Sequence, residues 1–253
     1  MMKKVINSFV LMLVSSVGIS QSIVTDRPTQ GVSSEVVPLG AFQIETGMGV
    51  ELTPQVVSGL NHRSFVLPTS LFRIPIANKL ELRVANTLRF NKSESFFDDE
   101  DGRWQIDDLQ AGFKWKITGG ETWRPQIALM SHVVVPTGSQ VNTPYGLINK
   151  ILVSNNFSNG VCLGYNIGYD FFGEDNQSLT YTLGLAFPVS ASVGAYIESY
   201  GTYNNFETFI TNANAGFTYL LNDNLQFDYS FGIGINNRMN YQALGVSFLF
   251  EKK

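Results

Sequence analysis

The chain has 253 residues, of which 15% are charged and 13% aromatic, and its formal net charge at pH 7 is −4. Charged residues make up about a quarter of a typical soluble domain, so this composition argues against an ordinary soluble fold. The acidic balance gives no electrostatic basis for binding nucleic acid. The single cysteine, Cys162, excludes an internal disulfide and a cysteine-based metal site.

The first twenty residues have the pattern of an export signal. Lys3 and Lys4 precede an apolar stretch over residues 5–17, and small residues follow it just before Gln21. The apolar stretch is short for a helix that must cross about 30 Å of hydrocarbon, which makes a membrane anchor the weaker alternative. We therefore predict a signal peptide over residues 1–20.

From residue 40 onward the dominant pattern is an alternation of apolar and polar residues. It is clearest in residues 161–171 and 225–235, where every second side chain is large and apolar. Successive side chains of a strand point to opposite faces. About twelve segments have the length of ~10 residues that is typical of a membrane-crossing strand. They lie near residues 40–52, 63–75, 79–90, 105–117, 123–136, 145–155, 160–171, 178–188, 191–202, 208–221, 224–235 and 241–250.

The connections between these segments alternate in length. One set consists of short turns rich in Asn, Gly and Asp, such as residues 77–79 and 222–224, whereas the other set is longer and more polar. This asymmetry is typical of outer-membrane barrels. We therefore predict an all-β fold over residues 40–253, a single closed antiparallel transmembrane β-barrel of about twelve strands in an up-and-down meander. Both termini are expected on the periplasmic side, and Ser93–Asp101 is expected to be the most exposed loop.

Most charges within the predicted strands share one register, opposite the apolar face. An Arg or Lys facing lipid near the membrane centre costs about 2–4 kcal/mol, so we expect the charged face to line the lumen. Side chains often fill the interior of small barrels, so these charges form either a structural salt-bridge network or a transport path, and both interpretations stay open. The candidate lumen-lining residues are Glu45, Arg73, Glu81, Arg83, Asp108, Lys114, Glu198 and Asp228, the first six of which are expected to form a central cluster.

The last predicted strand has features that bear on membrane assembly. Leu244, Val246, Phe248 and Phe250 alternate with small or polar residues. Such a strand resembles the signal that the barrel-assembly machinery recognises, although residues 251–253 follow the terminal aromatic residue. The predicted partners are therefore this machinery, outer-membrane lipids and a small-molecule solute, without nucleic acid.

Several short motifs occur in a characteristic order along the chain. They are Thr25-Asp26-Arg27-Pro28, Val37–Gly47, Leu71-Phe72-Arg73, Leu80–Arg83, Asp108-Leu109 with Gly112 and Lys114, Pro136-Thr137-Gly138 and Asn166–Tyr169. Together they resemble the outer-membrane transporter family labelled "MetA-pathway of phenol degradation". The resemblance implies a barrel that moves small molecules, hydrophobic or aromatic ones included, across the outer membrane. It also favours the interpretation of residues 21–39, which include Asp26 and Arg27, as a plug inserted in the lumen. The alternative is a flexible periplasmic tail.

The sequence offers no set of residues typical of an active site. His132 lies on the inner register, but no Ser-centred turn or His–carboxylate spacing accompanies it, and His62 and His132 do not supply a set of metal ligands. We therefore predict a pore or transporter for small molecules, without enzymatic activity, metal or cofactor. Two other classes stay open, a structural or surface-recognition outer-membrane barrel and a soluble secreted barrel that binds ligands in its core.

Overall fold

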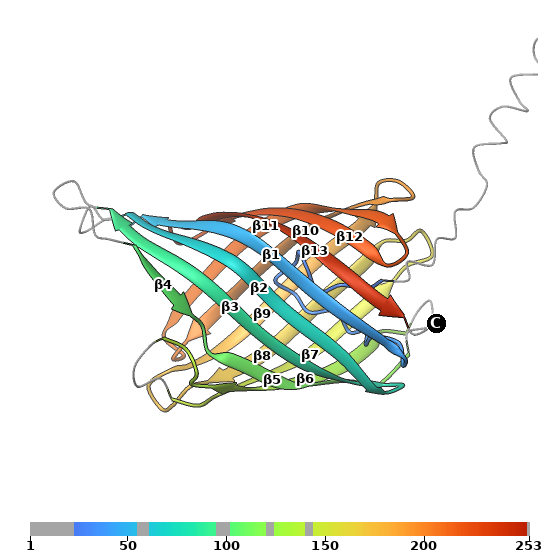
Figure 1. The fold of residues 1–253 in the computed structure, drawn as a ribbon, viewed down its shortest axis with the longest axis horizontal. Helices are drawn as coiled ribbons and strands as arrows, with labels where there is room; N and C mark the ends of the chain where they lie inside the picture. Colours follow the sequence, from blue (N-terminus) through green and yellow to red (C-terminus); the bar gives the residue numbers. More distant parts are fainter. Residues whose placement is uncertain (1–22, 55–60, 95–101, 120–123, 140–143, 252–253) are drawn as a thin grey trace, which may run out of the picture.

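The structure, a computed structural model, describes residues 23–54, 61–94, 102–119, 124–139 and 144–251, which form one barrel of β-strands (Figure 1). No helix in these ranges is long and apolar enough to cross a membrane. The predicted signal peptide and most of the predicted loop Ser93–Asp101 lie outside the described residues. The strands are β1 (Ala41–Pro54), β2 (Asn61–Ala77), β3 (Leu80–Glu94), β4 (Arg103–Ile106), β5 (Leu109–Lys116), β6 (Gln126–Val135), β7 (Gly146–Asn156), β8 (Cys162–Phe171), β9 (Gln177–Pro188), β10 (Val193–Asn204), β11 (Thr208–Asn222), β12 (Leu225–Gly234) and β13 (Asn240–Glu251).

Antiparallel pairing of sequential strands builds the wall, and β13 pairs with β1 to close it. The closing register pairs Ala41 with Glu251, so the first and last strand ends lie at the same rim. β4 and β5 both pair with β3 and share one position in the wall, so the thirteen strands form a twelve-position ring. The predicted closed, up-and-down barrel of about twelve strands is confirmed.

The wall between β3 and β6 is interrupted at Asp107 and Asp108, where the sequence predicted one continuous strand over residues 105–117. The two carboxylates bond in different directions. Asp107 pairs with Arg89 of the neighbouring strand β3 at 2.7 Å, whereas Asp108 Oδ1 accepts a hydrogen bond from the backbone N of Gly138, beyond β6, at 2.8 Å. These contacts accompany the end of β4 and the restart of the wall as β5.

The wall presents apolar side chains outward and polar side chains inward. Ile167 and Phe231 are 63% and 43% exposed, whereas Arg73 and Lys114 are fully buried. Aromatic residues gather at the rims, where the ring of Phe42 lies over neighbouring rings of β2 and β13. A barrel that is soluble in water requires the opposite arrangement, so this apolar exterior contradicts the soluble secreted alternative and indicates a membrane barrel.

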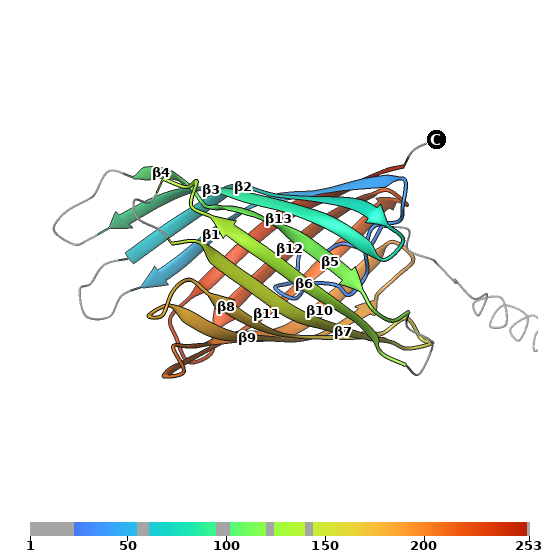
Figure 2. The same cartoon turned by 90° about the horizontal axis from the view of Figure 1, so that it is seen from below.

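The N-terminal segment (residues 23–40) lies inside the barrel, near the rim where β1 begins and β13 ends (Figure 2). It has turns and bends but no strand. Apolar contacts hold it at two places, because Ile23 and Val37 pack with Leu249, and Val32 packs against a buried patch of β6 and β7. Polar contacts with the wall account for most of its other interactions.

Candidate functional site in the barrel lumen

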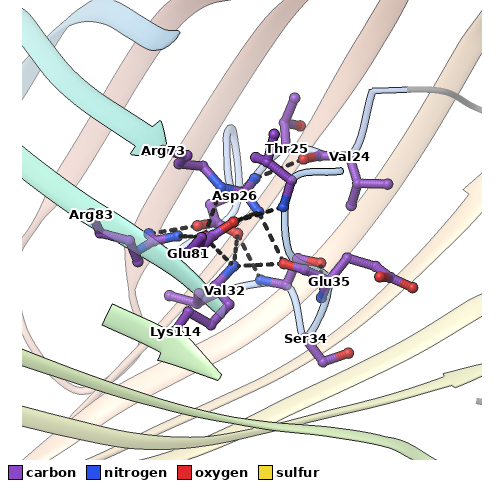
Figure 3. Close-up of polar contacts among 12 residues, drawn as sticks. Val24, Thr25, Asp26, Val32, Ser34, Glu35, Arg73, Glu81, Arg83 and Lys114 are labelled. Atoms are coloured by element: carbon purple, nitrogen blue, oxygen red, sulfur yellow. Dashed lines mark hydrogen bonds and ion pairs between the residues drawn. The ribbon is translucent and has the colours of Figure 1, made fainter. Parts of the chain in front are cut away.

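Six buried charged side chains meet inside the barrel beside the N-terminal segment (Figure 3). Glu81 lies at their centre, because its Oε1 is 3.0 Å from Arg73 Nε, 2.8 Å from Arg83 Nη1 and 3.4 Å from Lys114 Nζ. Arg73 Nη1 also lies 3.0 Å from Glu45 Oε1. We call this group the charge cluster, and its members are Asp26, Glu45, Arg73, Glu81, Arg83 and Lys114.

The strand register explains why these side chains meet. Arg73 on β2 lies directly opposite Arg83 on β3, and Glu81 on β3 lies directly opposite Lys114 on β5. Like charges directly opposite each other destabilise a sheet, but Glu81 bonds to both arginines. The charge cluster holds three acids and three bases, so each buried charge has a partner. Removal of one member would leave an uncompensated buried charge.

The acids of the charge cluster bind the backbone of the N-terminal segment. Glu45 Oε2 accepts hydrogen bonds from the backbone N of Asp26 at 3.0 Å and of Arg27 at 2.9 Å. Glu81 Oε2 accepts one from the backbone N of Val37 at 2.8 Å. These carboxylates therefore satisfy buried N–H groups that have no strand partner.

The bases of the charge cluster bind carbonyl groups of the same segment. Arg73 donates to the carbonyl O of Val24 at 2.7 Å and of Glu35 at 2.9 Å. Lys114 donates to the carbonyl O of Glu35 at 3.0 Å, and the Glu35 side chain pairs with Lys116 at 2.7 Å. The charge cluster thus holds the segment through both the N–H groups and the carbonyl groups of its backbone.

Asp26 is the member of the charge cluster that the N-terminal segment contributes. Its Oδ2 lies 2.6 Å from Arg83 Nη2, and its Oδ1 lies 3.3 Å from Lys114 Nζ. Burial by itself would raise the pKa of the Asp26 carboxyl, but Lys114, Arg83 and Arg73 outweigh burial and hold this pKa well below its usual range. Asp26 therefore stays charged at physiological pH and ties the segment to the wall.

The opposite wall binds the segment with fewer charges. Glu198 on β10 accepts hydrogen bonds from the backbone N of Gln30 and of Gly31, both at 2.8 Å. Asn166 on β8 accepts one from the backbone N of Val32 at 2.7 Å and donates one to its carbonyl O at 3.1 Å. One carboxylate and one neutral amide therefore hold residues 30–32.

Arg27 binds Asp228 on β12 with two hydrogen bonds, Nε to Oδ2 at 3.2 Å and Nη2 to Oδ1 at 3.1 Å. Its guanidinium lies against Gly47 and Gly245, which face each other across β1 and β13. A Cβ atom at Gly245 would lie 2.2 Å from Arg27 Nε, and one at Gly47 would lie 2.4 Å from Nη2. This glycine pair therefore makes the space that Arg27 occupies.

The structure brings most of the predicted lumen residues to the N-terminal segment. Seven of them bond to it, namely Glu45, Arg73, Glu81, Arg83, Lys114, Glu198 and Asp228. Asp108 does not join the cluster, because its Oδ1 accepts from Gly138 at the β4–β5 break, and Asp26 takes its place among the six. A role of these residues in a transport path stays a prediction.

Sequence reasoning missed several groups that hold the segment. Asn166, Gln126 and Ser154 bond to it from the wall, and Tyr196 donates to the carbonyl O of Pro28 at 3.2 Å. Their positions on the inner register were the available signal. Within the described ranges, no group of three or more His, Cys, Asp or Glu side chains is placed to hold a metal ion.

A closed barrel with an apolar exterior, aromatic rims and a charged interior is an outer-membrane β-barrel protein. The sequence model of one family, described as "Putative MetA-pathway of phenol degradation", matches residues 25–250. The chain therefore belongs to this family, as its motifs predicted.

Solved structures with a similar fold include a channel and a porin. An outer membrane channel from Pseudomonas putida F1 superposes with a TM-score of 0.68 at 12% identity, covering 88% of this chain and 100% of the other. The KdgM porin in complex with disordered oligogalacturonate has a TM-score of 0.52 at 9% identity, covering 81% and 98%. At these identities the likeness shows the fold. No curated protein matches the sequence.

Proposed function

We propose that the protein is a channel for small molecules in the outer membrane of a Gram-negative bacterium, and that residues 23–40 plug its periplasmic side. The observation that carries the proposal is how the lumen is occupied. A separate segment of the chain fills the space between the charge cluster and Glu198, and it is held by hydrogen bonds and ion pairs. Such a segment has a docked and a released state, which lets a barrel be closed and opened.

The solute class follows from the family and the fold. The description of the family names phenol degradation, and a protein of similar fold is an outer membrane channel. The family description supports small aromatic or hydrophobic molecules as the solutes, and the similar fold supports passage through the barrel. A catalytic role is disfavoured, because His132 Nε2 accepts a hydrogen bond from Arg83 Nε at 3.2 Å and is not free to act as a general base.

The route to the membrane completes the proposal. Residues 1–20 act as the signal peptide, the barrel-assembly machinery recognises β13, and lipids surround the finished wall. Support comes from the outward side chains Phe248 and Phe250 at the end of β13, whose rings lie 6.2 Å apart at the rim.

Deletion of residues 22–36 tests the proposal. We expect the deleted barrel to conduct a much larger current than the full-length mature chain in planar bilayers, and to swell liposomes faster in small sugars. Heat-modifiable gel migration shows that both proteins are folded barrels. Equal currents would contradict the plug. A folded barrel that conducts nothing with or without residues 22–36 would favour the structural or surface-recognition role.

A further inference from the structure

A cavity of about 250 Å³ lies inside the barrel next to the N-terminal segment. Its lining includes Ser70 and Thr87, which lie further from the turn between Ala77 and Leu80 than the arginines of the charge cluster do. The cavity therefore faces the end of the barrel that carries the longer loops. Because Arg27 and Val32 of the segment also line the cavity, a solute that enters from the loop side meets the plug in this cavity.

Three cations line the cavity, and two of them are already paired. Arg27 lies 3.1 Å from Asp228, and Arg83 lies 2.6 Å from Asp26. Lys150 on β7 makes no hydrogen bond and no ion pair within 4.0 Å among the described residues. Its ammonium group is therefore available to a ligand.

Carboxylates elsewhere in the lumen influence Lys150 only from a distance. Asp170, Asp26 and Glu198 act on it electrostatically, each from more than 4.0 Å, and Arg83 opposes their effect. Asp170 lies opposite Ile148 on the β7–β8 ladder, one diagonal step from Lys150. A negative charge brought into the cavity would approach Lys150 more closely than these carboxylates do.

The same wall contains a second unused donor. Arg83 Nε always carries a proton, so the His132 Nε2 that accepts from it is unprotonated and the proton of the neutral ring lies on Nδ1. This buried Nδ1 has no hydrogen-bond partner among the described residues. His132 lies diagonal to Lys150, because Met130 is opposite Lys150 in the β6–β7 register. Asp170 Oδ1 on β8 is also buried without a hydrogen-bond partner among the described residues, but Asp170 does not line the cavity, whereas Lys150 and His132 do, and these two donors favour an anion there.

The rest of the cavity is partly apolar. Val32, Leu71 and Met130 contribute to its lining, and a cavity of this volume is smaller than typical drug-sized sites of about 300–1,000 Å³. We propose that the cavity binds a small monocarboxylate with an apolar body, with its carboxylate on Lys150 and its body against Leu71 and Met130. This proposal deepens the channel function and rests on it, because such a site selects solutes at the plug.

Ligand-observed NMR titration of the refolded full-length barrel in detergent tests the site, with benzoate, benzyl alcohol and acetate as probes. We expect benzoate to bind the wild-type barrel at least tenfold more tightly than either benzyl alcohol or acetate. Lys150→Met should weaken benzoate at least tenfold and leave benzyl alcohol unchanged, whereas Lys150→Arg should retain benzoate. Lys79→Met, at an exposed turn, removes the same charge outside the lumen and should change nothing.

Three results would overturn the site. They are no benzoate binding by the wild-type barrel, equal affinities for benzoate and benzyl alcohol, and unchanged benzoate affinity in Lys150→Met. Equal affinities for acetate and benzoate would overturn the proposed contact of the apolar ligand body with Leu71 and Met130. Heat-modifiable migration confirms that each variant is folded. Bilayer conductance separates the two proposals. A barrel that binds benzoate but conducts no current would support the proposed site and contradict the proposed channel function.

Discussion

Two parts of the barrel wall hold the N-terminal segment by different kinds of interaction. The wall of β1, β2, β3 and β5 uses the six interlocked charges of the charge cluster, whereas the wall of β8–β10 uses hydrogen bonds to Glu198 and Asn166. Arg27 of the segment forms a further ion pair with Asp228 on β12. Removing one partner of a buried ion pair costs about 3–5 kcal/mol, because it leaves an uncompensated buried charge, while a hydrogen bond to a charged group contributes about 1.5–3 kcal/mol. We therefore expect the segment to leave the β8–β10 wall first and to stay tethered at the cluster and at Asp228.

The largest expected effect follows from Glu81→Gln. This change leaves Arg73, Arg83 and Lys114 facing two acids, so the docked segment should lose about 3–5 kcal/mol. Because each 1.4 kcal/mol is a factor of about ten, the open probability in planar bilayers should rise more than a hundredfold. Glu207→Gln removes an equal charge from an exposed loop and should not alter the current. An unchanged open probability in Glu81→Gln would contradict the role of the cluster.

A smaller effect is expected from Glu198→Gln. The amide keeps the size of the side chain but replaces one of the two oxygens that accept from Gln30 and Gly31. The loss of a hydrogen bond to a charged group costs about 1.5–3 kcal/mol. Hydrogen exchange of residues 30–32 should accelerate, while that of residues 24–27 stays slow. Equal acceleration of both stretches would contradict the asymmetry between the two walls.

Gly245→Ala tests the slot that holds Arg27. The added Cβ would meet the guanidinium, and overpacking of this kind costs about 1–3 kcal/mol. We expect faster hydrogen exchange at Arg27 without unfolding of the barrel. Gly164→Ala is the matched control, because a Cβ at Gly164 meets no atom within 4 Å. If both variants behave alike, the glycine pair has no special role.

The smallest expected effect is that of pH. The pKa of Asp26 is depressed in the folded protein, so its contribution to docking is fully present above the unfolded value of about 4 and is lost only as pH falls through the lower folded value. The difference in current between Asp26→Asn and the wild-type barrel should therefore stay constant from pH 7 to about 4, with Asp26→Asn conducting more across this whole range. A difference that disappears between pH 6 and 5 would contradict this assignment.

The inner and outer faces of the wall were predictable because alternation is a local property. Arg73, Glu81 and Lys114 fall on the polar register of three segments, and this alone indicated that they face inward. Asp108 shares that register, yet it bonds to a loop backbone at an interruption of the strand. Register gives the face of a residue, but it does not show where a ladder breaks.

The sequence by itself determined the barrel, its approximate strand number and the direction of its charged face, because a period of two needs only neighbouring residues. Only the tertiary structure decided which side chains meet. Asp26 reaches Arg83, and Arg27 reaches Asp228, across about 60 and 200 residues of chain that closure of the ring brings together. The slot at Gly47 and Gly245 likewise exists only where β13 returns to β1. Strand stagger and closure set these distances, and the apolar–polar alternation within a single segment does not determine either of them.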